Sequence, residues 1–580
     1  MASSSLSPDP VAKDPKPDSG PTVFEGEGMA DQTLAAVDYD DDVKLVLELN
    51  ETIAEAKALK PTSLAKAKHR PDWPQWEQGI CEELATLDKA RTWVLVDPPT
   101  GANIIGSKWV FHTKKDAAGN IVQYKACLVM QGFSQVPGIN YFDMYAPVAK
   151  LTSIRTVLTL ATHLDLKLHQ IDIKGAYLNG ELNNEEAIYM CQPPGYTDLA
   201  LLCHVCHLHK TLYRLKQSGH HWYQKLVEIL VKNLRFKLCE VDQAVFVKRS
   251  KKTLVIIVVH IDDCIITASA LSLVDELKMQ IRKHVEITDL GELHWLLGIE
   301  VTRNREEQTI ALLQRSYLES IIHCFRFNEL KPVLTPMEPH IKLTNAQSPL
   351  TGAKYASMQH IPYHKAIGSL MYAVLSTHPD ISYAISTVSR FSSNPGLPHW
   401  EAVHRIYRYL IGTKNLQLTY GGARKPLHRY TDADGSMAED RKAISGYAFL
   451  IDGGAMSWAS KKQEIILLSM TESEYIAVTH TTKEVLWLRS FIGEVLTPLD
   501  VPITLFSNNQ SIIALAKDHQ YHARTKHIDI HFHFIRWVVD NGKIRLVFCP
   551  TNDMIADTLT KAPPSPKVKH FAAELGLCTD

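Results

Sequence analysis

The chain lacks the sequence features that mark membrane, exported and disulfide-linked proteins. Its longest apolar run, residues 254–259, is far shorter than the roughly 20 residues that span a bilayer. Its ten cysteines are scattered over 580 residues and suggest no disulfide framework. The first residues do not show the charged segment followed by an apolar one that an export signal has. We therefore expect a soluble intracellular protein with no membrane partner.

The chain also has no excess of charge of one sign. It contains 62 Lys and Arg against 63 Asp and Glu, which gives a net charge of −1 and a pI of about 7.1. This balance is unlike the strongly basic composition that would by itself indicate a nucleic-acid partner, so any site for a polyanion must come from local clusters. The apolar content of 45% and the charged content of 22% are typical of globular proteins. The length allows three or four domains with their own cores.

The first part of the chain changes from a polar tail to alternating elements. Residues 1–45 are rich in Ser, Pro, Gly and Asp, which predicts a disordered acidic tail. The segment WPQWEQGICEELATLDKA, which begins at Trp73, has the periodicity of an amphipathic helix. Two apolar strands in 107–133 flank a Gly119-Asn120 turn and predict a hairpin. Helical and strand patterns then alternate to about residue 330.

The second part of the chain contains two further blocks. Residues 331–425 have a mostly helical pattern, with loops expected at 331–361 and 393–398. Strands return in 428–458, where they are joined by a Gly453-Gly454 turn. The third block ends with a strand at 544–550 and a short helix at 552–562, and the chain shows no internal repeat.

Two adjacent acids, Asp262 and Asp263, interrupt the most apolar strand pattern of the chain. Burying unpaired carboxylates costs several kcal/mol or more, so a divalent metal is one way to compensate them. Neighbouring strand residues point to opposite faces, so both acids can share a metal only near a turn, at the tip of a hairpin. A solvated Asp-Asp turn between two core strands explains this stretch equally well.

A third acid, Asp172, stands inside another apolar strand pattern, between Ile171 and Ile173. Three carboxylates on adjacent strands can hold two Mg²⁺ ions, which activate a 3′-hydroxyl and stabilise the leaving pyrophosphate in phosphoryl transfer. The alternative is an acid at a strand end that pairs with a nearby Lys such as Lys174.

These acids lie in a series of motifs that resembles the reverse transcriptase of copia-type retrotransposons. The resemblance covers residues 72–335, continues to about 576, and implies an α/β (α+β) protein with a fingers–palm fold. It also implies that Asp172, Asp262 and Asp263 are the catalytic, metal-binding carboxylates. The motifs that carry it are KWVF (108–111), YKACLVMQGFSQVPGINYFDMYAPV (124–148), QIDIKGAYLNGEL (170–182), LYRLKQSGHHWYQKL (212–226), HIDD (260–263) and DLGELHWLLGIEV (289–301).

The resemblance also implies three substrate-binding residues. Tyr177 matches the bulky residue that screens the sugar 2′ position of the incoming nucleotide, although an aromatic residue in the palm core explains it as well. Lys125 lies on the expected fingers hairpin, where a cation meets a triphosphate, but a solvated strand lysine is the simpler interpretation. Gln217 matches the segment that lines the nucleotide and template site.

Several positions depart from the family pattern. Cys127 stands where Arg is usual, and a thiol cannot replace a guanidinium aimed at phosphate. Arg214 stands in place of a usual Gly, so a positive φ there would be strained. The other departures are His220 and His221, where basic Arg is common, and His260, where Tyr is commoner.

The last block resembles the ribonuclease H domain of the same elements. Two-metal hydrolysis needs about four converging carboxylates, and the resemblance implies Asp432, Glu474 and Asp557 as three of them. For Glu474 the alternative is a capping box formed with Thr471. The segments involved are YTDADGS (430–436), LLSMTESEYIAVTH (467–480), ITLFSNNQSIIALAK (503–517) and NDMIADTLTK (552–561).

The fourth acid of the family pattern is missing from this chain. It belongs where the sequence reads Ser507-Asn508-Asn509-Gln510, and Asn508 can offer a metal only a neutral amide oxygen. We therefore expect ribonuclease H activity to be severely reduced or absent.

The segment CHVCH (203–207) matches a heme-attachment pattern and also looks like part of a zinc cluster. We reject both interpretations, because no export signal is present and no second Cys/His pair lies at finger spacing. The resemblance places this segment on a strand that leads into LYRLKQS.

The expected organisation is therefore a disordered tail at 1–45, a reverse transcriptase at 72–335, a helical connection or thumb-like region at 336–425, a ribonuclease H-like α/β domain at 426–565 and a C-terminal tail at 566–580. No protease motif and no integrase zinc pattern is found, so we expect a piece of a longer polyprotein.

The expected activity is RNA-directed DNA polymerase, with Mg²⁺ or alternatively Mn²⁺ as the cofactor. The expected partners are an RNA/DNA primer–template, dNTPs and other retroelement proteins. The expected location is the cytoplasm in the context of a virus-like particle, with the nucleus as the alternative. The rival hypothesis is a catalytically decayed relic that folds and binds nucleic acid without polymerising.

Overall fold

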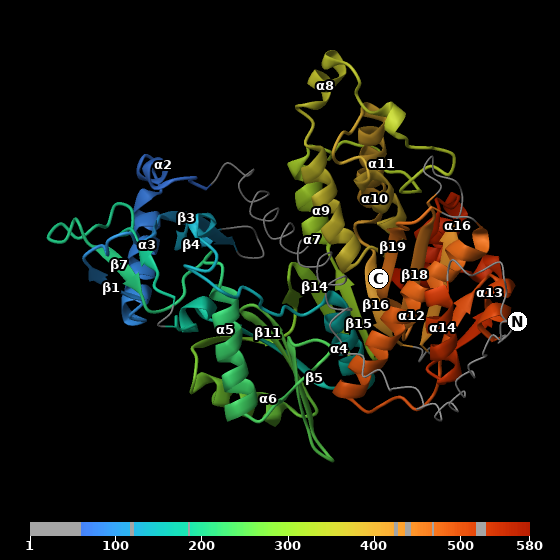
Figure 1. Ribbon diagram of the computed structural model, residues 1–580, viewed down its shortest axis with the longest axis horizontal. Coiled ribbons are helices and arrows are strands. Elements are labelled where there is room, and N and C mark those ends of the chain that lie inside the picture. Colours follow the sequence, from blue (N-terminus) through green and yellow to red (C-terminus); the bar gives the residue numbers. More distant parts are fainter. Residues whose placement is uncertain are drawn as a thin grey trace, which may run out of the picture.

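The computed structural model describes residues 60–115, 121–183, 186–422, 427–434, 442–466, 469–517 and 529–579. The tail expected at 1–45 and the Gly119-Asn120 turn therefore lie outside the described residues. Within these ranges, every helix is either too short or too polar to cross a membrane. The chain forms an N-terminal unit, a central sheet with its helices, a helical block and a C-terminal α/β unit (Figure 1).

The N-terminal unit, which we call the fingers, is built on helix α3 (Trp73–Lys89) and the antiparallel pair β3 (Ser107–Lys115) and β4 (Ile121–Met130). Trp76 of α3 is fully buried and packs edge-on against Phe111 and Tyr124 of the two strands. This contact explains the helical periodicity around Trp73, because the apolar stripe of α3 covers the hairpin. A small sheet completes the fingers, in the order β1 (Trp93–Val96), β7 (Val205–Leu208), β6 (Tyr189–Met190), β2 (Ile104–Ile105).

The central unit, the palm, is a six-stranded sheet. The side chains of β10 alternate between two cores: Val255, Ile257 and Val259 face one, and Ile256 and Val258 face the other. Burial on both faces explains why this strand has a continuous apolar run and not an alternating pattern. Helices α5 (Ser218–Val227) and α6 (Leu271–Arg282) contribute to the first core, and α4 (Leu151–His163) contributes to the second. The strand order is β12 (Ile287–Glu292), β5 (Lys167–Ile173), β11 (Asp263–Ala268), β10 (Leu254–His260), β9 (Val245–Arg249), β8 (Lys237–Leu238).

A third sheet joins distant parts of the chain, in the order β13 (Trp295–Leu296), β14 (Ile299–Asn304), β15 (Thr309–Leu313), β16 (Gln417–Gly421), β22 (Leu577–Cys578). The segment expected as a C-terminal tail is thus folded as far as residue 579. It forms α16 (Ser565–Glu574) and then β22, because Phe571, Leu575 and Leu577 are buried in the same core as the palm.

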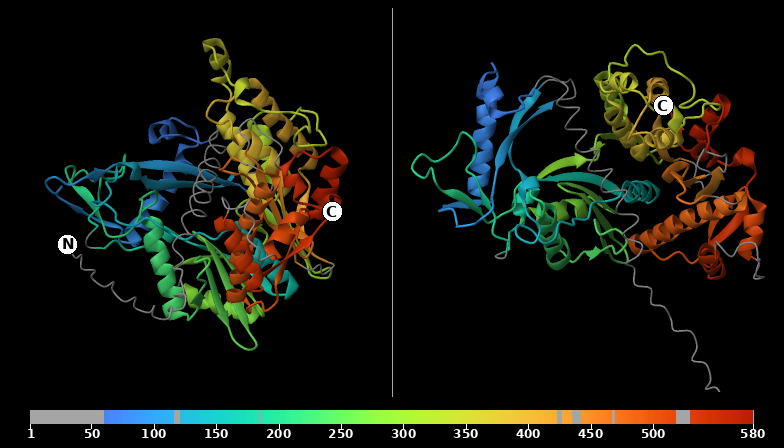
Figure 2. Two further views of the ribbon diagram at one scale, coloured as in Figure 1. Left: turned by 45° about the vertical axis from the view of Figure 1, so that its right-hand side comes forward. Right: turned by 45° about the horizontal axis from the view of Figure 1, so that its top comes forward.

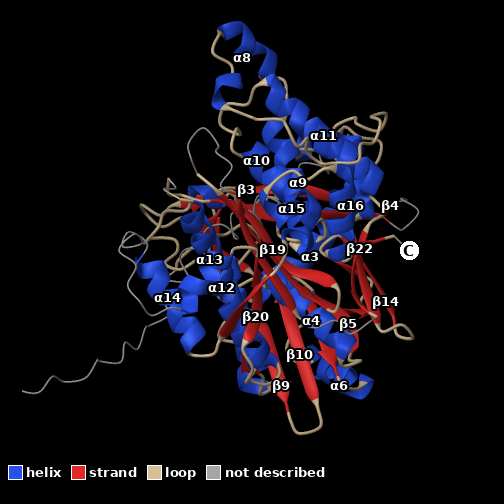
Figure 3. Cartoon of the chain, turned by 90° about the vertical axis from the view of Figure 1, so that its right-hand side faces the viewer, coloured by secondary structure: helices blue, strands red, loops and turns tan. Residues whose placement is uncertain are grey.

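The helical block stands together at the top of Figure 3. It consists of α7 (Arg315–Cys324), α8 (Gly352–Met358), α9 (Tyr363–Ser376), α10 (Ser382–Ser389) and α11 (Leu397–Thr413). Helix α8 and a 3-10 turn at Asn345–Gln347 lie within the segment expected as a loop at 331–361. A capping box at Thr344 supports that turn. The capping residues are a local signal, but the segment as a whole has no helical periodicity and was therefore expected to be a loop.

The C-terminal unit is a five-stranded sheet in the order β19 (Gly454–Lys462), β18 (Ile444–Ile451), β17 (His428–Asp434), β20 (Ile503–Ser507), β21 (Ile544–Phe548). The first three strands are antiparallel, and β17, β20 and β21 run parallel. Its helices are α12 (Met470–Val495), α13 (Gln510–Lys517), α14 (Asp529–Asp540) and α15 (Asp557–Thr560). The short helix expected at 552–562 is split into a 3-10 turn at Thr551–Asp553 and α15. We call this the RNase H-like unit; it and the fingers lie on opposite sides of the palm (Figure 2).

Candidate functional sites: two groups of carboxylates

The palm brings the three acids of the first group together at one end of its sheet. Strands β10 and β11 form a hairpin in which His260 pairs with Asp263, so that Ile261 and Asp262 make the two-residue turn. On the other side of β11, Asp263 pairs with Asp172 of β5. Cross-strand partners point to the same face of a sheet, so Asp172 and Asp263 are neighbours on one face, with Asp262 beside them at the hairpin tip.

The turn that carries Asp262 has an unusual backbone. Ile261 has a φ of 61°, which is rare for a β-branched residue and matches the first position of a type II′ turn. Two hydrogen bonds hold this conformation: Trp222 Nε1 donates to the Ile261 carbonyl (2.8 Å), and the Ile173 amide donates to the Asp262 carbonyl (2.9 Å). The surrounding palm therefore fixes the position of the acids at a local energetic cost.

The surroundings of this group raise the pKa of two of its acids. Desolvation, followed by the negative charge of Asp172, raises the pKa of Asp262, whereas the charge of Lys125 lowers it. Desolvation and Asp262 raise the pKa of Asp263 to about 6, although Gln170 Nε2 donates a hydrogen bond of 3.1 Å to its Oδ1. The acids thus repel one another and would be stabilised by a nearby cation.

Histidine 260 adds no positive charge to this group. It is 8% exposed, and desolvation lowers its pKa to about 4. Where the family pattern more often has Tyr, this chain therefore has a neutral imidazole beside the acids.

Lys125 and Tyr177 both lie near the acids. Lys125 is on β4 of the fingers, opposite His112, and its charge acts on the pKa of Asp262. Tyr177 lies in the 3-10 turn Ala176–Asn179 that follows β5, and packs edge-on against Tyr213 at 5.5 Å. Burial and the charge of Asp262 raise its pKa to about 12. Tyr177 therefore packs against the palm core and also lies within electrostatic reach of Asp262.

Gln217 is placed differently from a substrate-binding side chain. It is fully buried, its Oε1 accepts a hydrogen bond from Gln135 Nε2 (3.0 Å), and its Nε2 donates to the Asn140 carbonyl (2.8 Å). Both ends of the amide are thus used to fix the loop 131–140 against α5. The sequence gave no signal of these two long-range partners.

The departures from the family pattern have visible structural consequences. Arg214 has a φ of 69°, the positive value that favours glycine. Its carbonyl oxygen lies so close to Gly132 that a Cβ there would overlap it. Cys127 is buried opposite Val110 on the fingers hairpin.

The two histidines of α5 contact protein atoms. His221 Nε2 is 2.6 Å from Glu186 Oε2, and both side chains are buried. His220 Nδ1 is 2.8 Å from the Tyr145 carbonyl oxygen and 3.6 Å from Asp143 Oδ2. One ring nitrogen of each histidine is therefore engaged with protein atoms.

The second group of acids is in the RNase H-like unit. Asp432 on β17, Glu474 on α12 and Asp557 on α15 are all buried. Desolvation and then the charge of Asp432 raise the pKa of Glu474 to about 8 and that of Asp557 to about 6. Lys561 Nζ lies 2.9 Å from Asp557 Oδ1. The structure therefore brings the three predicted acids together, with one lysine beside them.

Asn508 follows β20 and faces the same group of acids. Its Nδ2 donates a hydrogen bond of 2.9 Å to Asp432 Oδ1, and Thr560 Oγ1 donates one of 2.5 Å to Asp432 Oδ2. The capping box with Thr471 is not formed, because α12 begins earlier: its N-cap is Ser469, which accepts from the Glu472 amide. Glu474 thus lies in the second turn, where its side chain faces the acids.

The donor set of both groups suits a hard cation, because it consists of carboxylate oxygens. In the RNase H-like unit, Glu474 Oε2 is buried with no hydrogen-bond partner among the described residues. Burying such an oxygen costs free energy unless a cation or a water molecule binds to it. In the described part of the chain, no three His, Cys, Asp or Glu side chains are already arranged to hold a metal ion, so ligation in either group requires side-chain movement.

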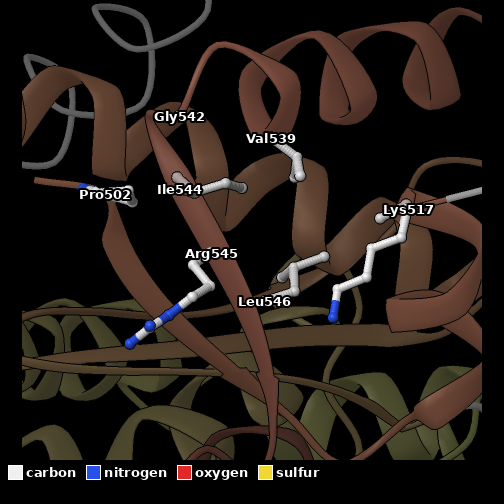
Figure 4. Close-up of a pocket in the computed structure, with 8 residues that line it drawn as sticks. Pro502, Lys517, Val539, Gly542, Ile544, Arg545 and Leu546 are labelled. Atoms are coloured by element: carbon white, nitrogen blue, oxygen red, sulfur yellow. The ribbon is translucent and has the colours of Figure 1, made fainter.

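The CHVCH segment and a cavity beside β21 offer fewer groups that could take part in catalysis or bind a metal. The last three residues of the CHVCH segment lie on β7, where a strand was expected. Cys206 pairs with Leu95 and Met190 there, and burial raises the pKa of its thiol to about 12. An apolar cavity of about 220 Å³ lies between β21 and its helices, with Lys517 and Arg545 at its edge (Figure 4). Its lining holds no acid or nucleophile.

Comparisons with known proteins show which proteins this chain is similar to. Residues 90–339 match the family described as reverse transcriptase (RNA-dependent DNA polymerase). The chain is 41% identical over 522 residues to the retrovirus-related Pol polyprotein from transposon TNT 1-94 of Nicotiana tabacum, which covers 89% of this chain and 39% of that protein. It is 35% identical over 506 residues to the one from transposon RE1 of Arabidopsis thaliana, which covers 87% of this chain and 34% of that protein.

Among solved structures, the foamy viral protease-reverse transcriptase in complex with RNA/DNA hybrid matches with 11% identity and a TM-score of 0.38, over 82% of this chain and 53% of that one. The chain spans 39% and 34% of the length of the two plant relatives. Residues 90–339 thus match a reverse transcriptase domain, and over most of its length the chain is similar to the Pol polyproteins of plant retrotransposons.

Proposed function

We propose that this chain is an RNA- and DNA-templated DNA polymerase that adds dNTPs to a primer 3′-hydroxyl. The observation that carries the proposal is the pairing of Asp263 with Asp172 beside a turn that holds Asp262. Three carboxylates at one end of a sheet repel one another, and desolvation together with this repulsion raises the pKa of Asp262 and of Asp263. Without a cation such an arrangement has little structural value, since the repulsion only destabilises the fold.

Asp172, Asp262 and Asp263 would hold the divalent ions, Mg²⁺ or Mn²⁺. When bound, the ions activate the primer 3′-hydroxyl and stabilise the leaving pyrophosphate. Lys125, on the fingers side of Asp262, would bind the triphosphate of the incoming nucleotide. The ring of Tyr177 would lie under its sugar and exclude a 2′-hydroxyl. The hydrogen bonds that hold the turn at Ile261 keep the backbone of the acids in place, so that only their side chains need to move when the metal ions bind.

Primer extension tests this proposal. We expect the parent chain to extend a DNA primer on RNA and DNA templates with Mg²⁺ or Mn²⁺, and Asp262→Asn to reduce extension by roughly a thousandfold or more. Asp275→Asn, an exposed acid on α6 of the same unit, is the matched control and should retain the parent rate. Extension that survives Asp262→Asn would contradict the assignment.

For the second group of acids, we propose that ribonuclease H activity is severely reduced or absent. The family's fourth acid is replaced by Asn508, and the amide of this residue is already used to donate a hydrogen bond to Asp432. One carboxylate fewer weakens both the metal site and its hold on the attacking water. Cleavage of an RNA/DNA hybrid by the parent chain at the rate of Asn508→Asp would contradict this proposal.

A catalytically decayed relic that folds and binds nucleic acid is the second candidate. The unfavourable φ of Arg214, the loss of the family's Arg at Cys127 and the neutral Asn508 favour it. Absence of primer extension by folded parent chain with both metals would support this candidate over the polymerase.

The remaining partners follow from the proposed reaction. They are an RNA/DNA primer–template, dNTPs and other proteins of the same retroelement. We propose that the chain acts in the cytoplasm within a virus-like particle, with the nucleus as the alternative location. Immunofluorescence of the expressed chain together with sedimentation of particles tests this location.

A further inference from the structure

The junction between the palm and the C-terminal units is built around Arg155. This side chain lies in the second turn of α4 and is buried, with 5% exposed. Its Nε donates to the Met456 carbonyl on β19 (2.7 Å), and its Nη1 donates to the carbonyls of Leu375 (2.7 Å) and Ser376 (3.1 Å) at the end of α9. One palm residue thus joins the backbone of the RNase H-like unit to that of the helical block.

Packing around Arg155 reinforces these hydrogen bonds. Its guanidinium carbon lies 4.2 Å from the ring centre of Trp458 on β19, a cation–π arrangement that gains strength when buried. The indole Nε1 of Trp458 donates to the Val374 carbonyl (3.0 Å), so the same ring also connects β19 with α9. Three segments far apart in the sequence therefore meet at two side chains.

A carboxylate of the RNase H-like unit lies within electrostatic reach of Arg155. Glu484 of α12 is half-buried, and desolvation raises its pKa, whereas the Ser457 hydroxyl and the charges of Lys150 and Arg155 lower it. The cations that stabilise this carboxylate thus come from the palm. Separating the two units would leave the buried guanidinium of Arg155 without its hydrogen bond to Met456, which is costly.

Helix α12 makes a second set of contacts with the palm. The ammonium of Lys150 lies 4.7 Å from the ring centre of Trp487, and Trp487 Nε1 donates to the Val241 carbonyl (3.2 Å). Glu494 Oε2 accepts from the amide of Glu240 (2.6 Å). The segment before β9 is thereby held by α12.

These contacts continue directly to the strand that carries the polymerase acids. Asp242 accepts hydrogen bonds from the Lys150 amide (3.3 Å) and the Ser153 hydroxyl at the start of α4, and from the Ala244 amide (3.1 Å). The Ala244 carbonyl accepts from the Val259 amide (2.9 Å) near the end of β10. The next residues of the chain form the turn with Asp262, so the position of that turn depends on how α4 and the segment at 240–244 are held.

Hydrophobic packing supports the same connection. The second core of the palm contains Val258 of β10 and Leu158 of α4 together with Leu450 of β18, Phe491 of α12 and Leu559 of α15. This core is continuous across the palm and the RNase H-like unit, and it covers one face of the palm sheet. An isolated palm would expose that face to water.

We propose that the RNase H-like unit serves as a structural support for the polymerase site, with Arg155 as the positioning residue that transmits this support. The role does not depend on hybrid cleavage, so the unit keeps a function when its own acids are impaired. The consequence for activity rests on the proposed polymerase function; the consequence for the palm backbone does not.

Hydrogen exchange and primer extension on the full chain test the proposal together. Arg155→Met removes the hydrogen bonds from the palm side, and Trp458→Leu removes the ring from the RNase H-like side. We expect both variants to exchange amide hydrogens faster in β5 and β10 and to lower kcat roughly ten- to a hundredfold, with the KM for dNTP changed less. Arg155→Lys, which retains charge and donors, should lie between Arg155→Met and the parent.

A matched control separates this role from general destabilisation. Ile512→Ala removes a buried side chain of α13 from a separate core of the RNase H-like unit, which contains Leu505 and Leu546. It should increase exchange in that unit and leave β5, β10 and kcat near parent values. Unchanged exchange in β5 and β10 in both Arg155→Met and Trp458→Leu would overturn the proposal. If the parent does not polymerise, the exchange measurement still decides it.

Discussion

Asn508 Nδ2 donates a hydrogen bond of 2.9 Å to Oδ1 of Asp432, at the position where the family pattern has an acid. Thr560 donates to the other oxygen of Asp432, so both oxygens of this carboxylate are engaged. An aspartate at 508 could not donate and would bring a second negative charge to Asp432. The amide therefore favours the metal-free state of this group of acids, whereas the family's acid would favour the metal-bound state.

The first prediction concerns the exchange Asn508→Asp. In EDTA we expect it to lower the free energy of unfolding by about 1–3 kcal/mol, because it replaces a hydrogen bond with repulsion in a buried place. With Mg²⁺ or Mn²⁺ we expect the loss to be recovered and hybrid cleavage to rise. Urea unfolding and cleavage of a labelled hybrid measure the two effects.

Asn509→Asp is the control for this prediction. Asn509 Oδ1 accepts from the amides of Ser511 and Ile512 at the start of α13, and an aspartate can accept the same bonds. Its unfolding free energy should change little and should not depend on the metal. Equal metal dependence in the two variants would mean that Asn508 has no special relation to Asp432.

The second prediction concerns Arg214. Its φ of 69° costs an L-residue about 1 kcal/mol relative to glycine, so Arg214→Gly should raise the free energy of unfolding by roughly that amount. Arg249→Gly, at the end of β9, removes an exposed arginine from ordinary extended backbone and should destabilise instead. Urea denaturation of both variants measures the difference, and a loss of stability in Arg214→Gly would show that the Arg214 side chain contributes more than the strain costs.

The sequence was informative about local patterns and less so about contacts between distant segments. The apolar run at 254–259, the three palm acids and the strand before LYRLKQS could all be located because their signals are local: periodicity, an interrupted apolar run and motif spacing. The junction at Arg155 could not be located, since its partner Met456 is 301 residues away and neither residue has a local signature. The folded C-terminus was missed for the same reason: β22 is only two residues long and depends on β16, far upstream.

The third prediction concerns metal removal at the palm. Desolvation raises the pKa of Asp263 to about 6, so at pH 7 the charged carboxylate destabilises the metal-free fold. Asp263→Asn should therefore raise the free energy of unfolding in EDTA by about 1–3 kcal/mol while it abolishes primer extension. Added Mg²⁺ should stabilise the parent more than the variant in a thermal melt. Asp275→Asn is again the control, and a destabilised Asp263→Asn in EDTA would show that Asp263 has a structural role.

The fourth prediction concerns Arg429, a charged side chain in the core of the RNase H-like unit. Arg429 is 2% exposed on β17, opposite Phe449. Its Nε and Nη2 have no hydrogen-bond partner in the part of the chain that the structure describes, and Nη1 reaches only the Leu427 carbonyl at 3.5 Å. Desolvation and then the charge of Arg489 lower its pKa from 12.5 to about 9. Arg429→Met fills a similar volume without charge, so it should raise the free energy of unfolding at pH 7 by a few kcal/mol, about the cost of a buried unpaired charge.

The pH dependence of stability distinguishes the cost of the buried charge on Arg429 from an effect of packing. Between pH 9 and 12.5 the unfolded chain keeps the proton on Arg429 while the folded chain loses it, so the unfolded state binds more protons and stability rises with pH. Below pH 9, Arg429 is charged in both the folded and the unfolded chain, and the full cost of burying its charge remains. The advantage of Arg429→Met over the parent should therefore be constant up to about pH 8.5 and shrink between pH 9 and 10. Arg489→Met is the comparison, because Arg489 donates to the carbonyls of Val501 and Leu499 and should destabilise when removed. An advantage of Arg429→Met that stays constant to pH 10 would mean that the guanidinium is solvated or paired.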